Sequence, residues 1–202
     1  MGIYNRNYPL TTIGGTLVIV IYCTFTLISW ALYPDPYGPI THYLSRLGNF
    51  DYSPIGAYFY NWGCILTGIA MFPFFFGLRV WYTKNVVQGV ILFLGLILGI
   101  ASGGALMAIG FYSEDQGAPH MDASRTFFIM LFVVLLLVII ALLLNPHFNK
   151  LVGLYGLAMT FSSLYFALTV DGTLTEWYSV FGSLVFVGLV SWNTMKKWEF
   201  LK

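Results

Sequence analysis

The segment 125–144 reads RTFFIMLFVVLLLVIIALLL, and it contains no charged side chain after its first residue. An α-helix rises about 1.5 Å per residue, so roughly twenty such residues match the ~30 Å hydrocarbon core of a bilayer. A stretch of this length and hydrophobicity is typical of a helix that crosses a membrane. The segment therefore predicts a transmembrane helix.

Similar segments recur along the whole chain of 202 residues, of which 58% are hydrophobic and only 8% are charged. A soluble domain carries about 25% charged residues, so this chain lacks the charge to cover a surface that faces water. Backbone polar groups in lipid must be paired internally, and segments of this length suit helices rather than barrel strands. The sequence predicts an all-α fold, a single domain over residues 1–202 that forms a six-transmembrane-helix bundle. The expected spans are residues 12–33, 55–78, 87–110, 125–144, 151–169 and 177–195.

The positive charges predict the orientation of the bundle, because short cytoplasmic connections carry an excess of Lys and Arg. Of the nine Lys and Arg residues, only Arg46 and Arg125 fall on the side opposite the two termini. We therefore predict a multi-pass protein of the cell membrane with cytoplasmic N- and C-termini. The other positive residues, on the side of the termini, are Arg6, Arg79, Lys84, Lys150, Lys196, Lys197 and Lys202.

The acidic residues gather on the opposite side, in or beside the first, third and fifth connections, and only Glu199 lies with the termini. Acidic residues contribute little to the positive-inside rule, so their concentration indicates a second reason, which we take to be functional. They are Asp35, Asp51, Glu114, Asp115, Asp122, Asp171 and Glu176.

Two of the three histidines accompany these carboxylates. His42 and Ser45 lie in the first connection, and Asp115, His120 and Asp122 lie in the third. Imidazole and carboxylate are ligands that zinc accepts, and a zinc-bound water can attack an ester or an amide. One hypothesis is therefore a zinc site with His42, His120, Asp115 and Asp122 as ligands. In that hypothesis Ser45, Asp115 and His120 are the candidate catalytic residues.

A structural interpretation of the same residues stays open. Asp122 and Ser124 would cap the fourth helix, and Asp171 and Glu176 would cap the sixth, because polar and negative side chains are favourable at helix N-termini. The spacing of His120 and Asp122 also matches no established metal-binding motif.

Small and polar residues inside the spans predict how the helices pack. Gly95, Gly99 and Gly103 recur at four-residue spacing in the third span and would let another helix approach closely, from this chain or from a second copy. Asn61 in the second span requires a hydrogen-bond partner in lipid. No acidic or basic residue lies deep within an expected span, which argues against an ion pump.

A set of short motifs resembles a known family. It comprises Leu44-Ser45-Arg46-Leu47-Gly48 in the first connection, a second helix that begins after Pro54 and contains Asn61, and Gly110-Phe111-Tyr112-Ser113-Glu114-Asp115 followed by His120. These features resemble the uncharacterised prokaryotic membrane family called domain of unknown function 998, which is similar in layout to the Frag and DRAM type six-helix proteins. The resemblance covers nearly the whole chain and implies a six-helix fold and topology, without an activity.

Three kinds of function remain. The first is a non-enzymatic membrane protein that binds membrane lipids, a second copy of itself or another membrane-protein subunit. The second is a metal-dependent hydrolase of membrane lipids, and the third is a small transporter. A net charge of +1 without a basic patch excludes nucleic acid as a partner.

Overall fold

The computed structural model of the protein describes residues 8–170 and 172–200. Within these residues the fold is all-α, without strands, and six helices are long and apolar enough to cross a membrane. The prediction of an all-α, six-transmembrane-helix protein is confirmed. The long helices are α1 (Leu10–Ala31), α2 (Gly56–Gly77), α3 (Val86–Phe111), α4 (Ala118–Leu144), α5 (Lys150–Thr169) and α6 (Thr173–Phe200), and three short 3-10 helices are η1 (Leu44–Gly48), η2 (Leu78–Trp81) and η3 (Glu114–Gln116).

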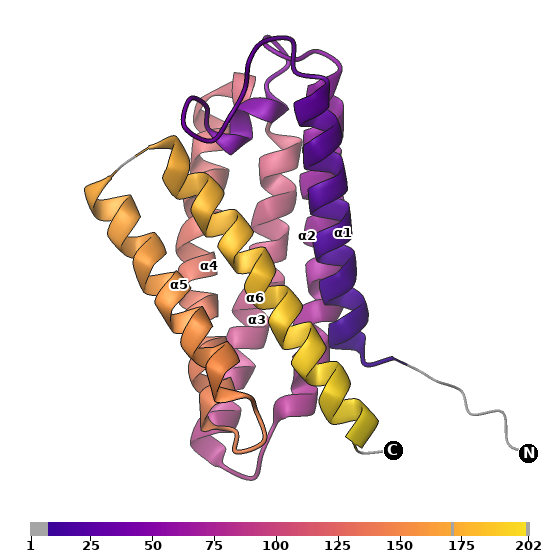
Figure 1. The fold of residues 1–202 in the computed structure, drawn as a ribbon, viewed down its shortest axis with the longest axis vertical. Coiled ribbons are helices and arrows are strands. Elements are labelled where there is room, and N and C mark those ends of the chain that lie inside the picture. Colours follow the sequence, from indigo (N-terminus) through magenta and orange to yellow (C-terminus); the bar gives the residue numbers. More distant parts are fainter. Residues whose placement is uncertain (1–7, 171, 201–202) are drawn as a thin grey trace, which may run out of the picture.

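The six helices form a ring in chain order. Each helix packs against the next, and α6 returns to pack against α1. In Figure 1, α1 begins and α6 ends at the lower end of the bundle, while the connections α1–α2, α3–α4 and α5–α6 lie at the upper end. We call the upper end, opposite the start of α1, the distal end.

Three glycines of α3 pack against other helices of the same chain. A Cβ atom on Gly103 would meet the carbonyl oxygen of Gly68 in α2, and one on Gly99 would meet the ring of Phe75. A Cβ atom on Gly95 would touch Val138 of α4. The predicted close approach is therefore present, and its partners are α2 and α4 of the same chain.

Two helices begin earlier than the hydrophobic pattern predicted. The fourth begins at Ala118 rather than at residue 125, and the sixth at Thr173 rather than at residue 177. Hydrophobicity marks only the part of a helix that lies in lipid, and the first turns of both helices carry polar residues beyond it. Gly117, with φ of 71°, turns the chain into α4, and Pro119 occupies its first turn, where a missing N–H is tolerated.

A folded segment, residues 37–50, covers the distal end, and we call it the distal cap. Two of its own residues, Leu44 and Leu47 of η1, are fully buried. Asn61 of α2 donates from Nδ2 to the carbonyl oxygen of Gly48 at 3.0 Å, which is the partner that the sequence required. The connection is thus fixed to the helices rather than free in solvent.

Aromatic residues fix the cap from the other side. The Trp30 indole N–H donates to the carbonyl oxygen of Tyr37, and the Trp177 indole N–H donates to that of His42. Burial raises the pKa of the Tyr37 hydroxyl, which therefore stays protonated and donates to the carbonyl oxygen of Tyr43 at 2.6 Å. The Trp30 bond thus holds the cap against α1, the Trp177 bond holds it against the start of α6, and the Tyr37 bond closes the cap on itself.

Candidate functional site

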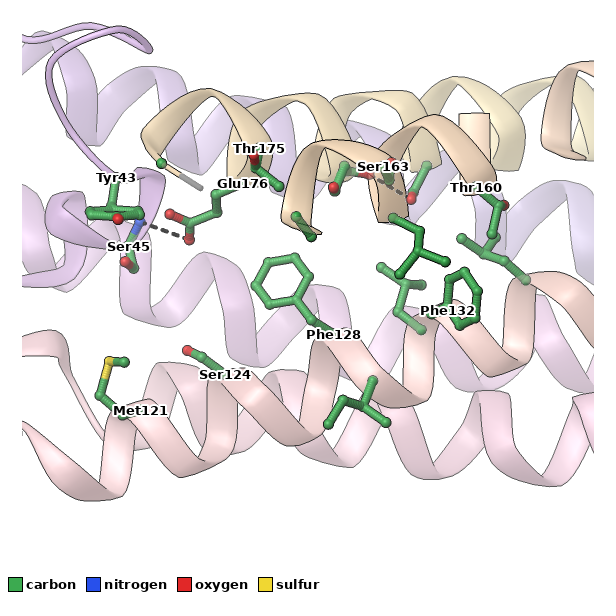
Figure 2. Close-up of a pocket in the computed structure, with 18 of the residues that line it drawn as sticks. Tyr43, Ser45, Met121, Ser124, Phe128, Phe132, Thr160, Ser163, Thr175 and Glu176 are labelled. Carbon is green, nitrogen blue, oxygen red and sulfur yellow. Dashed lines mark hydrogen bonds between the residues drawn. The ribbon is translucent and has the colours of Figure 1, made fainter. Parts of the chain in front are cut away.

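A cavity of about 700 Å³ lies beneath the distal cap, between α4, α5 and α6 (Figure 2). Its length follows from α4, whose lining residues run from His120 to Leu135. The fifteen residue-to-residue steps between them span roughly 22 Å of helix. The cavity therefore follows about four turns of α4 away from the distal end.

The two ends of the cavity differ in polarity. The distal end is lined by polar side chains, and the deeper part is lined mainly by apolar ones. The distal polar residues are Ser45, Arg46, Glu114, His120, Ser124, Thr175, Glu176 and Ser179, and the deeper apolar residues on α4 are Phe128, Ile129, Leu131, Phe132 and Leu135. Three further apolar residues lie nearer the distal end, Met121 at the start of α4 and Leu164 and Ala167 near the end of α5.

The hydroxyl groups that lie deeper add little polarity. Thr160 donates to the carbonyl oxygen of Gly156, and Ser183 donates to that of Ser179, each one turn back in its own helix. Ser163 donates to the sulfur of Met159 at 3.6 Å. Because these hydroxyls are already paired, the inner part of the cavity is apolar in practice.

Glu176 links α6 to the distal cap. Its Oε2 accepts a hydrogen bond from the backbone N–H of Leu44 at 2.8 Å, and its Oε1 accepts one from that of Ser45 at 3.2 Å. Figure 2 shows this carboxylate reaching from α6 toward Ser45 at the polar end of the cavity. Two N–H donors thus compensate a carboxylate that is largely removed from water.

Arg46 lines the cavity from the cap and is held by two neighbours. Its Nε lies 3.3 Å from Oε1 of Glu114, whose Oε2 also accepts a hydrogen bond from Asn49. The guanidinium lies 4.5 Å from the centre of the Tyr52 ring. The pair with Glu114 and the stacking on Tyr52 fix the guanidinium at the distal end.

His120 and Ser124 form a hydrogen-bonded pair on α4. His120 is buried, with 2% of its surface exposed, and its Nδ1 lies 2.7 Å from the carbonyl oxygen of Tyr112. Its Nε2 lies 3.3 Å from the Ser124 hydroxyl oxygen. Ser124 extends from α4 toward the cavity in Figure 2.

Thr175 provides a polar atom without a partner. Its hydroxyl oxygen is buried, lies in a residue that lines the cavity, and makes no hydrogen bond in the described part of the protein. A buried hydroxyl without a partner costs about 1–3 kcal/mol. The oxygen is closed off from solvent, so this cost belongs to the packing of the start of α6.

The structure brings only some of the expected site residues together. Ser45 and His120 line the cavity, whereas His42, Asp115 and Asp122 are not among its lining residues. His42 stacks on the Tyr37 ring with 4.9 Å between centroids. Asp115 accepts a hydrogen bond from the backbone N–H of Phe50, and Asp122 is exposed.

The four expected zinc ligands do not gather around a point. Across residues 8–170 and 172–200, no three His, Cys, Asp or Glu side chains form a group that could hold a metal ion. The first and third connections do meet, but through Arg46, Asn49 and Glu114. The zinc hypothesis thus receives no support from the geometry of these side chains.

The capping interpretation also requires correction. The N-cap of α4 is Gly117, which has no side-chain cap, so Asp122 and Ser124 lie beyond the first turn and cap nothing. Glu176 does lie in the first turn of α6. Its carboxylate, however, accepts hydrogen bonds from the backbone N–H groups of Leu44 and Ser45 in the distal cap. Asp171 lies outside the described residues.

The sequence interpretation missed the cavity residues of α4, α5 and α6, among them Ser124 and Thr175. The sequence did contain one indication that Ser124 belongs to the site. His120 and Ser124 are four residues apart, which places both on one face of a helix if that helix begins before residue 120. The expected start at residue 125 concealed this relationship.

A comparison with known protein families agrees with the resemblance of the motifs. The family described as "Protein of unknown function (DUF998)" matches residues 16–194. No curated protein and no solved structure has significant similarity to the chain. The family match spans all six helices and the connections that form the cavity. The chain therefore belongs to the DUF998 family of proteins of unknown function.

Proposed function

We propose that this protein binds an amphiphilic membrane lipid in the cavity, with the polar group of the lipid at the distal end and its alkyl chain between α4 and α5. The observation that carries the proposal is the change of polarity along the cavity. Arg46, Thr175 and Glu176 lie at one end, while Phe128 and Phe132 lie farther along α4. This arrangement matches the two parts of an amphiphile.

The polar end has to supply most of the selectivity. An alkyl chain that enters the cavity from the bilayer leaves one apolar environment for another, so its transfer contributes little. A hydrogen bond to Arg46 at the distal end is different, because a hydrogen bond to a charged group contributes about 1.5–3 kcal/mol. We therefore expect lipids to be distinguished by their polar groups rather than by chain length.

The charges support an orientation for this site. Among the described residues, Arg79, Lys84, Lys150, Lys196 and Lys197 lie toward the terminal end, and Arg46 and Arg125 lie at the distal end. The positive-inside rule then favours cytoplasmic termini. In a cell membrane the cavity would thus open near the outer leaflet. Self-association or a second membrane subunit stays a prediction. Gly95, Gly99 and Gly103 of α3 are not its interface, because α2 and α4 pack on them.

The test is native mass spectrometry of the purified full chain after extensive detergent exchange, combined with lipid extraction from the same sample. Leu164→Trp places a large ring in the cavity, whereas Leu168→Trp, one turn farther along α5, changes a side chain that is 76% exposed. We expect retained lipid on the wild type and on Leu168→Trp, and at least a severalfold loss on Leu164→Trp.

Two results would contradict the proposal. One is a wild-type protein that carries no lipid after mild detergent exchange although it remains folded. The other is equal lipid retention in Leu164→Trp and Leu168→Trp, because the lipid would then be bound on the outer surface of the bundle.

A further inference from the structure

We propose that Ser124 is a nucleophile activated by His120, and that the protein hydrolyses the acyl ester of a lipid bound in the cavity. This inference rests on the proposed function, because it takes the bound amphiphile as substrate. It differs from the zinc hypothesis in needing no metal.

The hydrogen bonds of His120 determine which nitrogen can act as a base. A carbonyl oxygen only accepts, so the 2.7 Å contact with Tyr112 requires a proton on Nδ1. In the neutral imidazole, Nε2 then carries the lone pair, and the Ser124 hydroxyl donates to it. The carbonyl oxygen of Tyr112 thus orients the ring in the way that a third group does in nucleophile–base pairs.

The hydroxyl of Ser124 differs from three hydroxyls of α5 and α6. Thr160, Ser162 and Ser183 each donate to a carbonyl oxygen four residues earlier in the same helix, which is the ordinary arrangement. Ser124 instead contacts the imidazole of the residue four positions earlier. Its oxygen is therefore next to a base rather than paired with the backbone.

Burial separates the roles of the two residues. His120 is almost fully buried, while Ser124 is only partly buried and lines the cavity. A substrate would therefore reach the hydroxyl oxygen before the ring. The 3.3 Å separation of Oγ and Nε2 is slightly long for a hydrogen bond, as is usual for such a pair without substrate.

The reaction balances with water as the only added reactant. Oγ of Ser124 attacks the ester carbonyl carbon as its proton moves to Nε2 of His120. The bond from this carbon to the alcohol oxygen then breaks, and the alcohol leaves with that proton. Water attacks the acyl-serine, passes a proton to Nε2, and releases the fatty acid as the proton returns to Oγ.

One cavity side chain offers donors for the negative oxygen that forms during this attack. The Arg46 guanidinium is held by Glu114 through its Nε and belongs to the polar end of the cavity, where the ester of a bound lipid would lie. Such donors stabilise the transition state more than the ground state.

A long-chain alkyl fluorophosphonate tests the pair directly, because it reacts with an activated serine when the P–F bond breaks and an Oγ–P bond forms. The full chain would be treated in lipid nanodiscs, and the adduct located by peptide mass spectrometry. We expect the adduct on Ser124 and none in Ser124→Ala. His120→Asn keeps an amide donor toward Tyr112 but removes the base, and should slow labelling by about 100-fold or more.

The controls separate this inference from the lipid-binding proposal. Ser162→Ala removes a hydroxyl of α5 that does not line the cavity and bonds to the Ala158 carbonyl oxygen instead of His120, and should label at the wild-type rate. Retained lipid, measured as above, should remain in Ser124→Ala. No adduct on folded wild-type protein, an adduct elsewhere, or equal labelling of His120→Asn would overturn the catalytic role, and lipid retention would still stand on its own.

Discussion

The carboxylate of Glu176 and the backbone N–H of Leu44 are joined by a hydrogen bond of 2.8 Å, although 132 residues separate them in the chain. The same carboxylate accepts from Ser45. One side chain at the start of α6 therefore holds the segment that covers the cavity. The contact connects the first connection of the bundle to its last helix.

Replacing this carboxylate should loosen the distal cap. In Glu176→Gln, one amide oxygen remains as an acceptor, while the NH₂ group faces a backbone donor. A hydrogen bond to a charged group contributes about 1.5–3 kcal/mol, so we expect a loss of that order in the free energy of unfolding. Thermal unfolding in detergent measures it, and hydrogen exchange should rise at residues 44–48. Glu199→Gln, at an exposed position, is the control, and an equal effect there would refute the anchoring role.

Substitution by alanine should destabilise the bundle at Gly103 and have little effect at the adjacent Gly104. A Cβ atom at Gly103 would press on the carbonyl oxygen of Gly68, while nothing lies within 4 Å of one at Gly104. We expect Gly103→Ala to destabilise the bundle by about 1–3 kcal/mol and Gly104→Ala to stay within about 0.5 kcal/mol of the wild type. Thermal unfolding in one detergent gives both values. Similar losses in the two variants would contradict the close contact of α2 and α3.

Asn61 should matter through its bond to the cap. Asn61→Ala leaves the carbonyl oxygen of Gly48 without its donor in a buried place. The expected loss is about 1–2 kcal/mol, reduced because Oδ1 of Asn61 already lacks a partner. Faster hydrogen exchange in residues 47–50 would accompany it. An unchanged melting temperature would mean that this bond does not hold the cap.

Labelling of introduced cysteines should report the orientation. In a Cys23→Ala, Cys64→Ala background, we expect Thr41→Cys and Gln116→Cys to react with a membrane-impermeant maleimide on intact cells. Lys84→Cys, at the opposite end of the bundle, should react only after permeabilisation. Reaction of Thr41→Cys and Gln116→Cys from opposite faces would contradict the shared distal end, and the reverse of the whole pattern would contradict cytoplasmic termini.

The helices could be predicted from the sequence because lipid selects for length and hydrophobicity. The segment 125–144 specifies a span by itself, and the glycine spacing in α3 indicates a close neighbour. The start of α4 at Ala118 was not predicted, because the first residues of the helix include the charged Asp122 and Arg125. Charged residues of this kind are typical of helix outside the hydrocarbon core. Hydrophobicity cannot distinguish such turns from a loop.

The cavity could not be predicted, because it depends on how three helices are rotated about their axes. Ser124, Ser163 and Ser179 come from α4, α5 and α6, and no local pattern reveals that they line one space. The expected meeting of the first and third connections did occur. The residues that make this contact were not the expected ones, because Arg46 and Glu114 form it while His42 lies against Tyr37.

The closed ring of helices bears on how the protein is made. Each of α2 to α5 can pack on the helix before it when it enters the bilayer, but the contact between α1 and α6 can form only after α6 has entered. That contact is specific, since Thr12 of α1 donates to the carbonyl oxygen of Ser191 and Gly15 packs against the Ser191 side chain. Thr175 and Glu176 belong to the same helix. The walls of the cavity are thus complete only when α6 joins the other five helices.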